Sequence, residues 1–479
     1  MSVGSKLKRW IGEERVEIAR ERLGDIAEQS LERHLRLAVT GLSQSGKTIF
    51  ITSLVHHLLH AHRSGSLPFF EVAASGRIIS SRDLSATSAH PFPFNQALAG
   101  LSQDPPRWPQ STTGLSEVRL AIRYRRPPGL RRLLGETGTL YLDIVDYPGE
   151  WLLDLPLMEL SFEQWCEQQK RLFAQAPRAS VADGWLAQLQ QIDWLAPADA
   201  AVLQRLSNAF TEILQQLRSG PDGLSLLQPG RCVLPGEHAG SELLVLFPLV
   251  LDHWPAGEVP ENSYLDLLQR RYDQYCEQIV KPFYTRHFSR FDRQVVLVDC
   301  LKTLNRGEAC FEDMKEALSA ILQSFNYGRS GFLRRLFSPR IDRVLFASTK
   351  GDHVTANQHH NLDRFLELIV EESQRNIRFD GIETRSLALS SVRSTQAAQA
   401  TVDGQQLSCL RGLRKDTGEE VALFPGEVPT ELPGPNDWSD ERFRFIDFAP
   451  RRLPLNELQA KHHIRLDQVL EYMTGDLFR

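Results

Sequence analysis

Hydrophobic positions along the chain change their period several times, and each change predicts a different kind of element. A short apolar run at 35–39 predicts a strand, followed by a glycine-containing loop and an apolar helix from Ile49 to about His60. Alternating positions over Ser116–Arg125, a Pro-Pro-Gly turn and a second apolar run over Thr139–Val145 predict a β-hairpin. The first third of the chain therefore contains a strand–loop–helix unit and a pair of strands.

Helical spacing dominates two other regions. Residues 11 to about 33 are expected to form a charged amphipathic helix, and most of 151–290 has the pattern of consecutive helices. Residues 61–114 have little periodicity, and so long a stretch is expected to be functional or partly helical. Further along, strands and helices alternate, which is typical of a sheet flanked by helices. These strands are expected at 295–299, 344–348 and 386–390, and the helices at about 311–324 and 358–377.

Composition narrows the class of protein. The 479 residues are 42% apolar and 24% charged, as in globular proteins, and the net charge of −5 gives no overall attraction for nucleic acid. No apolar run reaches the length of a transmembrane helix, and Glu13 and Glu14 interrupt the N-terminus before a secretory core could form. The six scattered cysteines include no CxxC pair. We expect a cytoplasmic protein, and peripheral contact with the inner membrane stays open.

Residues 41–48, GLSQSGKT, match G-x-x-x-x-G-K-[ST] at every defined position, between the expected strand and helix. Glycines let successive amides point inward around phosphate oxygens, and the following helix adds the positive end of its dipole. Lys47 is expected to bridge the β- and γ-phosphates and Thr48 to bind Mg²⁺. The alternative is a glycine-rich turn with an exposed lysine. The residues predicted to bind the nucleotide here are Gly41, Ser43, Gln44, Ser45, Gly46, Lys47, Thr48 and Ile49.

A second element follows the hairpin, where an apolar strand ends in Asp146 and continues as Tyr-Pro-Gly149-Glu150. At the carboxyl end of a strand, Asp146 can hold Mg²⁺ through water. The Gly149 amide can contact a γ-phosphate. The alternative is an Asp-x-Pro-Gly turn without a ligand.

A third element indicates the base. An apolar strand ends in Thr349-Lys350-Gly-Asp352. The Asp352 carboxylate can accept from N1–H and the 2-amino group of guanine, a donor pair that adenine lacks, and the stem of Lys350 can cover a face of the base. The alternative is an ATP-dependent P-loop enzyme in which these residues are accidental.

The order of the three elements resembles that of Ras-like GTPases related to translation factors, whose guanine motif is [N/T]-K-x-D. Ser391 and Val392 follow the next strand and resemble a degenerate form of the loop that contacts guanine O6 in those proteins. Over most of its length the chain resembles the YcjX family of bacterial stress-associated GTP-binding proteins. The shared features are GLSQSGKT, DYPGEWLLDLP, a helical block before TKGD, and VDCLKTLNRG at 298–307.

The resemblance implies an α/β fold: a Ras-like P-loop GTPase domain with a mostly parallel six-strand sheet, a large helical insertion and a small additional β/α tail. The expected parts are an N-terminal helix at 1–34, a first GTPase segment at 35–150, the helical insertion at 151–290, a second GTPase segment at 291–400 and a C-terminal extension at 401–479.

Two departures from the family pattern affect the expected chemistry. The threonine of switch I usually lies about 20 residues after the P-loop, whereas the candidates Thr112 and Thr113 follow an insertion of about 45 residues. Glu150 stands where a water-orienting glutamine is common, and its charge repels a γ-phosphate. The expected catalytic residues are Glu150, Lys47, Thr112 and Thr113, and the expected Mg²⁺ ligands are Thr48, Thr112 and, through water, Asp146.

The resulting hypothesis is a guanine-nucleotide-binding protein that hydrolyses GTP to GDP slowly, switches between the two states and acts in a bacterial stress response. A nucleotide-gated interaction module with negligible hydrolysis remains an alternative, as does the ATP-dependent enzyme. The expected partners are an unidentified regulatory or effector protein and no nucleic acid. Membrane contact is left open for two basic segments, the arginines at 119–132 and the basic, phenylalanine-containing stretch 329–340.

Overall fold

The computed structural model describes residues 32–63, 65–110, 112–129, 135–221, 223–324, 341–379, 381–402, 405–438 and 443–479. The N-terminal helix expected over 1–34 lies outside these residues, except for its last three positions, of which Arg33 begins a strand. The basic stretch 329–340 also lies outside them, as do Arg131 and Arg132. Within the described ranges no helix is long and apolar enough to cross a membrane.

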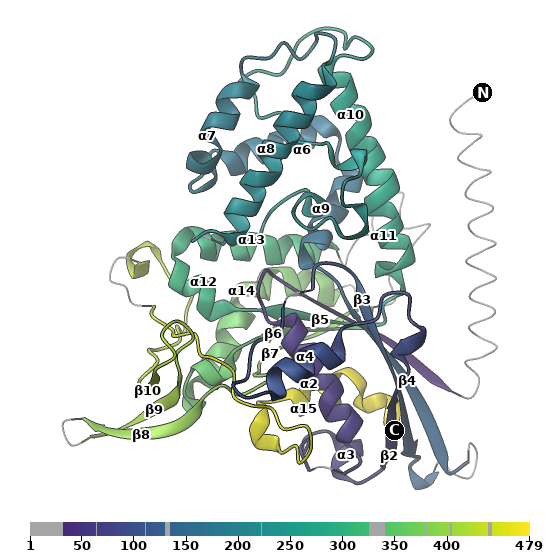
Figure 1. The fold of residues 1–479 in the computed structure, drawn as a ribbon, viewed down its shortest axis with the longest axis vertical. Helices are drawn as coiled ribbons and strands as arrows, with labels where there is room; N and C mark the ends of the chain where they lie inside the picture. The colour runs from purple at the N-terminus through teal and green to yellow at the C-terminus, as the bar shows by residue number, and fades with distance from the viewer. Residues whose placement is uncertain are drawn as a thin grey trace.

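A seven-stranded sheet forms the centre of the lower half of the molecule in Figure 1. Its strand order is β2-β3-β4-β1-β5-β6-β7, in which the five strands from β4 to β7 are parallel and β2 and β3 run antiparallel to their neighbours. The strands are β1 (Arg33–Gly41), β2 (Ile78–Asp83), β3 (Ser116–Arg125), β4 (Thr137–Asp146), β5 (Arg293–Val298), β6 (Arg343–Ser348) and β7 (Glu383–Ala388). The expected α/β class and mostly parallel sheet are confirmed.

The predicted number of six strands is wrong, because the low-periodicity stretch contributes the edge strand β2. Only Ile78 of this strand is buried, so its sequence lacks the alternation that marks a strand. It forms by pairing with the free edge of β3. The same stretch is partly helical, as expected, with α3 (Glu71–Ala74) and α4 (Phe94–Ser102).

Each face of the sheet carries its own layer of helices, because successive strand residues point to opposite faces. Val295 and Leu297 of β5 belong to one core, whereas Val296 and Val298 belong to the other. The first face is covered by α2 (Lys47–His60), α4 and α15 (Leu466–Thr474). The second face is covered by α12 (Cys300–Arg306), α13 (Glu308–Ser324) and α14 (His359–Phe379).

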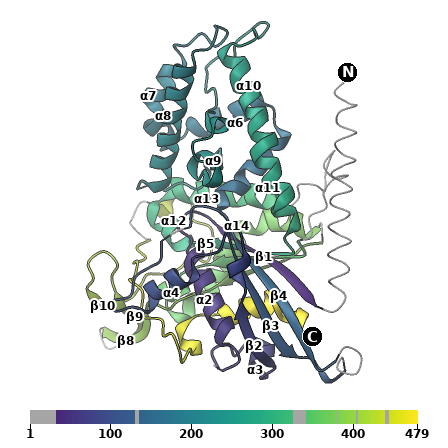
Figure 2. The same cartoon turned by 45° about the vertical axis from the view of Figure 1, so that its right-hand side comes forward.

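A helical block stands above the second face, and Figures 1 and 2 show it from two directions. The 149–159 segment leads into it as a 3₁₀ helix directly after β4. The block contains α6 (Phe162–Phe173), α7 (Arg178–Leu189), α8 (Ala200–Ser219), α9 (Gly230–Val233) and α10 (Tyr264–Tyr275), which continues through a π-helical turn (Cys276–Val280) into α11 (Lys281–Arg286). Its apolar side chains and those of the second sheet face form one continuous core.

The chain ends in a small antiparallel sheet followed by α15. The sheet has the order β10-β9-β8 and consists of β8 (Gln396–Val402), β9 (Gln405–Leu413) and β10 (Glu420–Leu423). After β10 the chain returns past β9, where the Lys415 amide donates to the Asp447 carbonyl at 2.9 Å. This return brings Asp447 and Phe448 close to the carboxyl ends of the parallel strands.

Candidate nucleotide-binding site

A cavity of about 390 Å³ opens at the carboxyl ends of the parallel strands, where ligands bind in open α/β sheets. Its wall contains residues of the first and third sequence elements, which lie more than 300 residues apart in the chain. The second element adjoins the wall through Thr112, which contacts Asp146, and Arg218, which contacts Glu150. The predicted site residues that line it are Gln44, Ser45, Gly46, Lys47, Thr48, Ile49, Thr112, Thr349, Lys350, Asp352, Ser391 and Val392.

The phosphate loop between β1 and α2 has the backbone that its sequence requires. Gln44 and Gly46 have φ values of 61° and 85°, in the left-handed region. A Cβ on Gly41 would lie 2.6 Å from the Leu297 carbonyl oxygen, so only glycine fits there. The Lys47 Nζ reaches back to the Gly41 carbonyl oxygen at 3.4 Å. The loop is thus curled around its own lysine, and its residues from Gln44 to Thr48 line the cavity.

Asp146 is the last residue of β4 and lies opposite Val39 of β1. Its carboxylate is fully buried, and the Thr112 hydroxyl donates to Oδ2. Burial raises the pKa of Asp146, while Lys47 and the Thr112 hydroxyl lower it. In the described part of the chain, Oδ1 is buried without a hydrogen-bond partner. A buried carboxylate oxygen that lacks a donor, close to the Thr112 hydroxyl, fits the oxygen chemistry that Mg²⁺ prefers.

Gly149 and Glu150 connect this end of the cavity with the helical block. A Cβ on Gly149 would lie 2.5 Å from the Gly41 carbonyl oxygen, so the 149–159 segment touches the phosphate loop directly. The Glu150 side chain is buried, and its Oε1 accepts from Nε of Arg218 at 3.1 Å. Arg218 itself lines the cavity. The phosphate end is therefore closed by residues from two segments outside the sheet.

The base end centres on Asp352. Its Oδ2 accepts from the Ser394 amide at 2.6 Å and from the Ser394 hydroxyl at 2.5 Å. Burial by itself raises the pKa of Asp352, but His353 and the donors of Ser394 hold it below its ordinary value. The carboxylate is thus kept charged and fixed in orientation, with capacity left to accept from a ligand.

Lys350 is held by two carboxylates on opposite sides. Its Nζ lies 2.8 Å from Asp299 Oδ2 and 2.5 Å from Asp447 Oδ1. Burial lowers the pKa of Lys350, but these two neighbours raise it above its ordinary value. The charge of the head group is satisfied on the protein, which leaves the apolar stem to cover a flat ligand.

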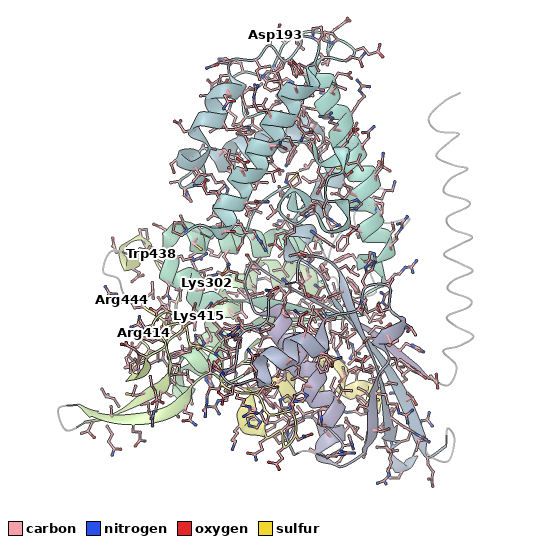
Figure 3. All side chains as sticks on the ribbon, in the orientation of Figure 1. Asp193, Lys302, Arg414, Lys415, Trp438 and Arg444 are labelled. Atoms are coloured by element: carbon pink, nitrogen blue, oxygen red, sulfur yellow. The ribbon has the colours of Figure 1, made fainter. Side chains whose placement is uncertain are left out.

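Aromatic and basic side chains complete the wall. Trp108 Nε1 donates to the Phe448 carbonyl at 3.2 Å, and the His353 and Phe448 rings pack edge to face at 5.1 Å. Lys302 of α12 donates to the Gln44 side chain, and burial lowers its pKa to about 8. Figure 3 places Lys302 and Lys415 on the same flank of the molecule, and both line the cavity.

The remaining predicted residues lie beside the cavity rather than on its wall. Gly41 forms the floor of the phosphate loop, and Ser43 lines a smaller neighbouring space of about 20 Å³ together with Lys302. Of the two candidate threonines, Thr112 contacts Asp146 and lines the cavity, whereas Thr113 is not part of the described lining. In the described ranges, the cavity included, no group of three or more His, Cys, Asp or Glu side chains is arranged to hold a metal ion.

Comparison with known proteins places this geometry in a family. The model of the YcjX-like family, DUF463, matches residues 35–478. The chain belongs to the YcjX-like family. It is 41% identical over 466 residues to the Ras-like GTPase YcjX of Escherichia coli, covering 95% of this chain and 98% of that protein. It is 42% identical over 467 residues to the Ras-like GTPase YcjX of Shewanella oneidensis, covering 94% and 95%.

Sequence reasoning missed several residues of the cavity in this YcjX-like protein. Lys302 lies within the quoted VDCLKTLNRG stretch but was assigned no role. Asp447, Phe448 and Trp108 come from parts of the chain with weak periodicity, and their approach to the base end depends on tertiary folding. Arg218 lies near the end of an ordinary amphipathic helix, and no feature of the sequence distinguishes it from a solvated arginine.

Proposed function

We propose that this protein binds guanine nucleotides together with Mg²⁺ and hydrolyses GTP to GDP. The relatives that share more than 90% of its length are named Ras-like GTPases. The single observation that carries the proposal is that one cavity is lined by Lys47 of the phosphate loop, by Thr112, whose hydroxyl donates to the buried Asp146, and by Asp352.

Preference for guanine follows from the state of Asp352. Its carboxylate is oriented by Ser394 and stays ionised, so it accepts strongly from N1–H and the 2-amino group. Adenine carries an unprotonated N1 and no 2-amino group, so an ATP-dependent reaction would leave this buried charge without a donor. The ATP alternative is therefore the weaker one.

Hydrolysis is in-line attack of water on the γ-phosphorus, with rupture of the bond to the β–γ bridging oxygen. Lys47 and the amides of the phosphate loop hold the β- and γ-phosphates. Thr48, Thr112 and, through water, Asp146 would hold Mg²⁺, which supplies neutralisation of the phosphate charge. Glu150 accepts from Arg218 and is turned away from the lining, so it is poorly placed to activate water. Slow intrinsic turnover, about 10⁻⁴ to 10⁻² per second, follows from such a site.

Switching follows from the contact between Gly149 and the phosphate loop. Release of the γ-phosphate changes the ligand of the Gly149 amide, and the 149–159 segment carries that change into the helical block. The resemblance to stress proteins extends the proposal to a role in bacterial stress responses, with a cytoplasmic effector protein as reader of the switch. Two alternatives to this proposal are peripheral membrane contact and a nucleotide-gated module with negligible hydrolysis. Phosphate release measured with and without cell extract distinguishes the second alternative from a GTPase.

The first prediction concerns the choice of base. In Asp352→Asn, the amide oxygen can keep the Ser394 donors, and the amide nitrogen then faces the base. Guanine loses its acceptor, whereas xanthine presents a carbonyl in place of the 2-amino group. Loss of a hydrogen bond to a charged group costs about 1.5–3 kcal/mol, so GDP affinity falls by about 10- to 100-fold while XDP affinity rises. Competition titrations of GDP, XDP and ADP against both proteins measure this.

Two further proteins make the titration decisive. Lys47→Ala removes the phosphate contact and lowers affinity for all three nucleotides, so its pattern differs from that of Asp352→Asn. Glu277→Gln, which changes an exposed carboxylate on the helical block, leaves every affinity unchanged. If Asp352→Asn keeps the wild-type preference for GDP, Asp352 does not read the base and the proposed function loses its main support.

A further inference from the structure

Arg218 extends from the helical block to the phosphate end of the cavity. It is the second-last residue of α8, and it lines the same cavity as Lys47, Thr48 and Thr112. Its Nε donates to Glu150, the residue that follows Gly149, and Gly149 contacts the phosphate loop. Because the Gly149 amide is the expected γ-phosphate donor, Arg218 lies at the end of the cavity where the terminal phosphate is expected rather than at the base end.

The ion pair with Glu150 uses only part of the capacity of the guanidinium group. Within the described residues, Nε makes the only hydrogen bond of this side chain, and both Nη atoms are free to donate elsewhere. The exposed fraction is 25% for the Arg218 side chain and 4% for the Glu150 side chain, so the arginine is the more accessible member of the pair. A guanidinium held at Nε and open at its two Nη atoms presents the fork that matches phosphate oxygens.

The other basic side chains of the wall are engaged differently. Lys350 is held between Asp299 and Asp447 at the base end, Lys415 lies beside Asp447, and Lys302 is bound to Gln44. Lys47 belongs to the phosphate loop itself. Arg218 is the cation that the helical block contributes at the phosphate end among the described lining residues.

We propose that Arg218 is a built-in arginine that stabilises the transition state of GTP hydrolysis, with Glu150 as its positioning residue. The proposal rests on the proposed function. Water adds to the γ-phosphorus, the bond to the β–γ bridging oxygen breaks, GDP leaves with that electron pair, and the proton of the water passes to the released phosphate. Arg218 donates from Nη to the γ-phosphate oxygens as charge shifts in the transition state.

This role of Arg218 also explains how a glutamate can be tolerated at position 150. Its negative charge, which would repel a γ-phosphate, is compensated by the guanidinium that it orients. A carboxylate at this position therefore fits a protein that carries its own arginine. GTPases with an arginine in the same chain turn over at about 10⁻² per second, roughly 30-fold faster than those that await one from a partner.

The test is single-turnover hydrolysis by full-length protein without any partner. Arg218→Ala is expected to lower the rate about 30-fold or more, with GDP and GTP affinities unchanged within about threefold. Arg218→Gln keeps a donor for Glu150 but not the charge, so it loses rate to the same extent. The matched control is Arg171→Ala, since Arg171 is an exposed arginine of the same block that pairs with Glu167. It hydrolyses GTP like the wild type.

A second readout separates catalysis from structure. GDP with aluminium fluoride mimics the transferring phosphoryl group, and the wild type is expected to bind this complex without a partner while Arg218→Ala and Arg218→Gln do not. Glu150→Ala removes the acceptor that holds Nε of Arg218, so it is expected to bind the mimic more weakly and to hydrolyse GTP more slowly than the wild type, whereas Glu150→Gln keeps an acceptor and recovers part of both losses.

The outcomes are distinguishable. Wild-type rates in both Arg218 variants overturn the proposal. It is also overturned if Arg218→Gln loses GDP affinity as strongly as it loses rate, or if this variant is thermally unstable, because the ion pair would then be structural. Failure of the wild type itself to bind guanine nucleotides in the titration would instead overturn the proposed function.

Discussion

Two buried aspartates, Asp352 in the cavity wall and Asp146 behind Thr112, have pKa values that are shifted in opposite directions. Burial raises the pKa of Asp352, but His353 and two hydrogen bonds from Ser394 hold it below its ordinary value, so the carboxylate is charged and oriented before any ligand binds. Asp146 receives one hydrogen bond, from Thr112, and burial raises its pKa. A charge that the protein leaves incompletely solvated is stabilised by what binds beside it. We therefore expect ligand binding at the phosphate end, unlike binding at the base end, to depend on a cation.

The second prediction follows from this difference. Asp146→Asn is expected to weaken GTP binding about 10- to 100-fold in Mg²⁺, as loss of a water-mediated metal contact does, and to leave binding in EDTA unchanged. Because the folded-state pKa of Asp146 is raised, its charge opposes folding near pH 7, so the nucleotide-free variant melts at a higher temperature. Calorimetric titration with and without Mg²⁺, together with thermal melts, measures both effects. An equal loss of affinity in EDTA would contradict the assignment.

Residue-level prediction succeeded where local sequence determines local geometry. The phosphate loop, Asp146 and the Thr-Lys-x-Asp turn each follow or end a strand, and parallel strands end at one edge of a sheet, so it follows from the pattern that the loop and the turn line one cavity, with Asp146 behind Thr112. Arg218 and Asp447 could not be found this way. Their positions depend on how the helical block and the tail fold back, over separations that no local pattern records.

At the scale of elements, the contact between the 149–159 segment and the phosphate loop is made by two glycines. Gly149 faces the Gly41 carbonyl oxygen so closely that a Cβ would lie 2.5 Å from it. Gly230 has a similar role behind the segment, where a Cβ would lie 2.1 Å from the Glu150 carbonyl oxygen. The 149–159 segment is therefore packed so closely between the phosphate loop and α9 that a side chain at either glycine would displace it.

The third prediction uses this fit. Gly149→Ala forces the segment off the phosphate loop and is expected to destabilise the protein by about 1–3 kcal/mol and to weaken GTP binding more than GDP binding. Gly184→Ala is the control, because Gly184 lies in α7 with open space around it, and it raises stability by about 0.4–1 kcal/mol. Urea unfolding and nucleotide titration measure both variants. Equal loss of GTP and GDP affinity in Gly149→Ala would argue against a γ-phosphate contact.

Elements with strong periodicity were predicted well, and those that tertiary contacts stabilise were not. The strand expected over Ser116–Arg125 has those bounds, and α2 and α14 lie where apolar spacing indicated. β2 was missed because one buried residue gives no alternation, and its strand state comes from pairing with β3. α12 was missed because seven residues between a strand and a longer helix carry too little pattern.

At the scale of the whole molecule, the helical block shares its core with the sheet. The aromatic side chains of the 149–159 segment and of α10 and α11 belong to the same cluster as Val296 and Phe346. Asp154 lies inside this cluster and accepts from Tyr275 OH at 2.6 Å and from the Gly230 amide at 2.7 Å. Burial, opposed by these donors, raises the pKa of Asp154 to about 6.

The fourth prediction is a pH dependence. Because the folded-state pKa of Asp154 exceeds its unfolded value of 3.8, its contribution to stability is fully present below about pH 4 and is lost as pH rises through about 6. Two pKa units correspond to about 2–3 kcal/mol. Asp154→Asn is therefore expected to be more stable than the wild type by that amount at pH 7.5, with the difference vanishing below pH 4. Urea unfolding measures the free energy of unfolding of both proteins across this pH range, and the effects of histidines common to both cancel in the difference. A difference that stays constant with pH would contradict the prediction.

The strand order also has a consequence for synthesis. β1 pairs with β4 on one side and with β5 on the other. The helical block lies between β4 and β5 in the sequence, so the ribosome synthesises all of it before β5. Arg293 of β5 is anchored to Asp476 by two hydrogen bonds of 2.6 Å, and Arg343 of β6 binds the same carboxylate. On the ribosome, the edge of β1 that pairs with β5 therefore stays unpaired while residues 42–292 are made, and β5 and β6 lack their contacts with Asp476 until that residue emerges. The open edge can pair with other chains during this time, and we expect chaperones that bind nascent chains to be needed for the protein's yield.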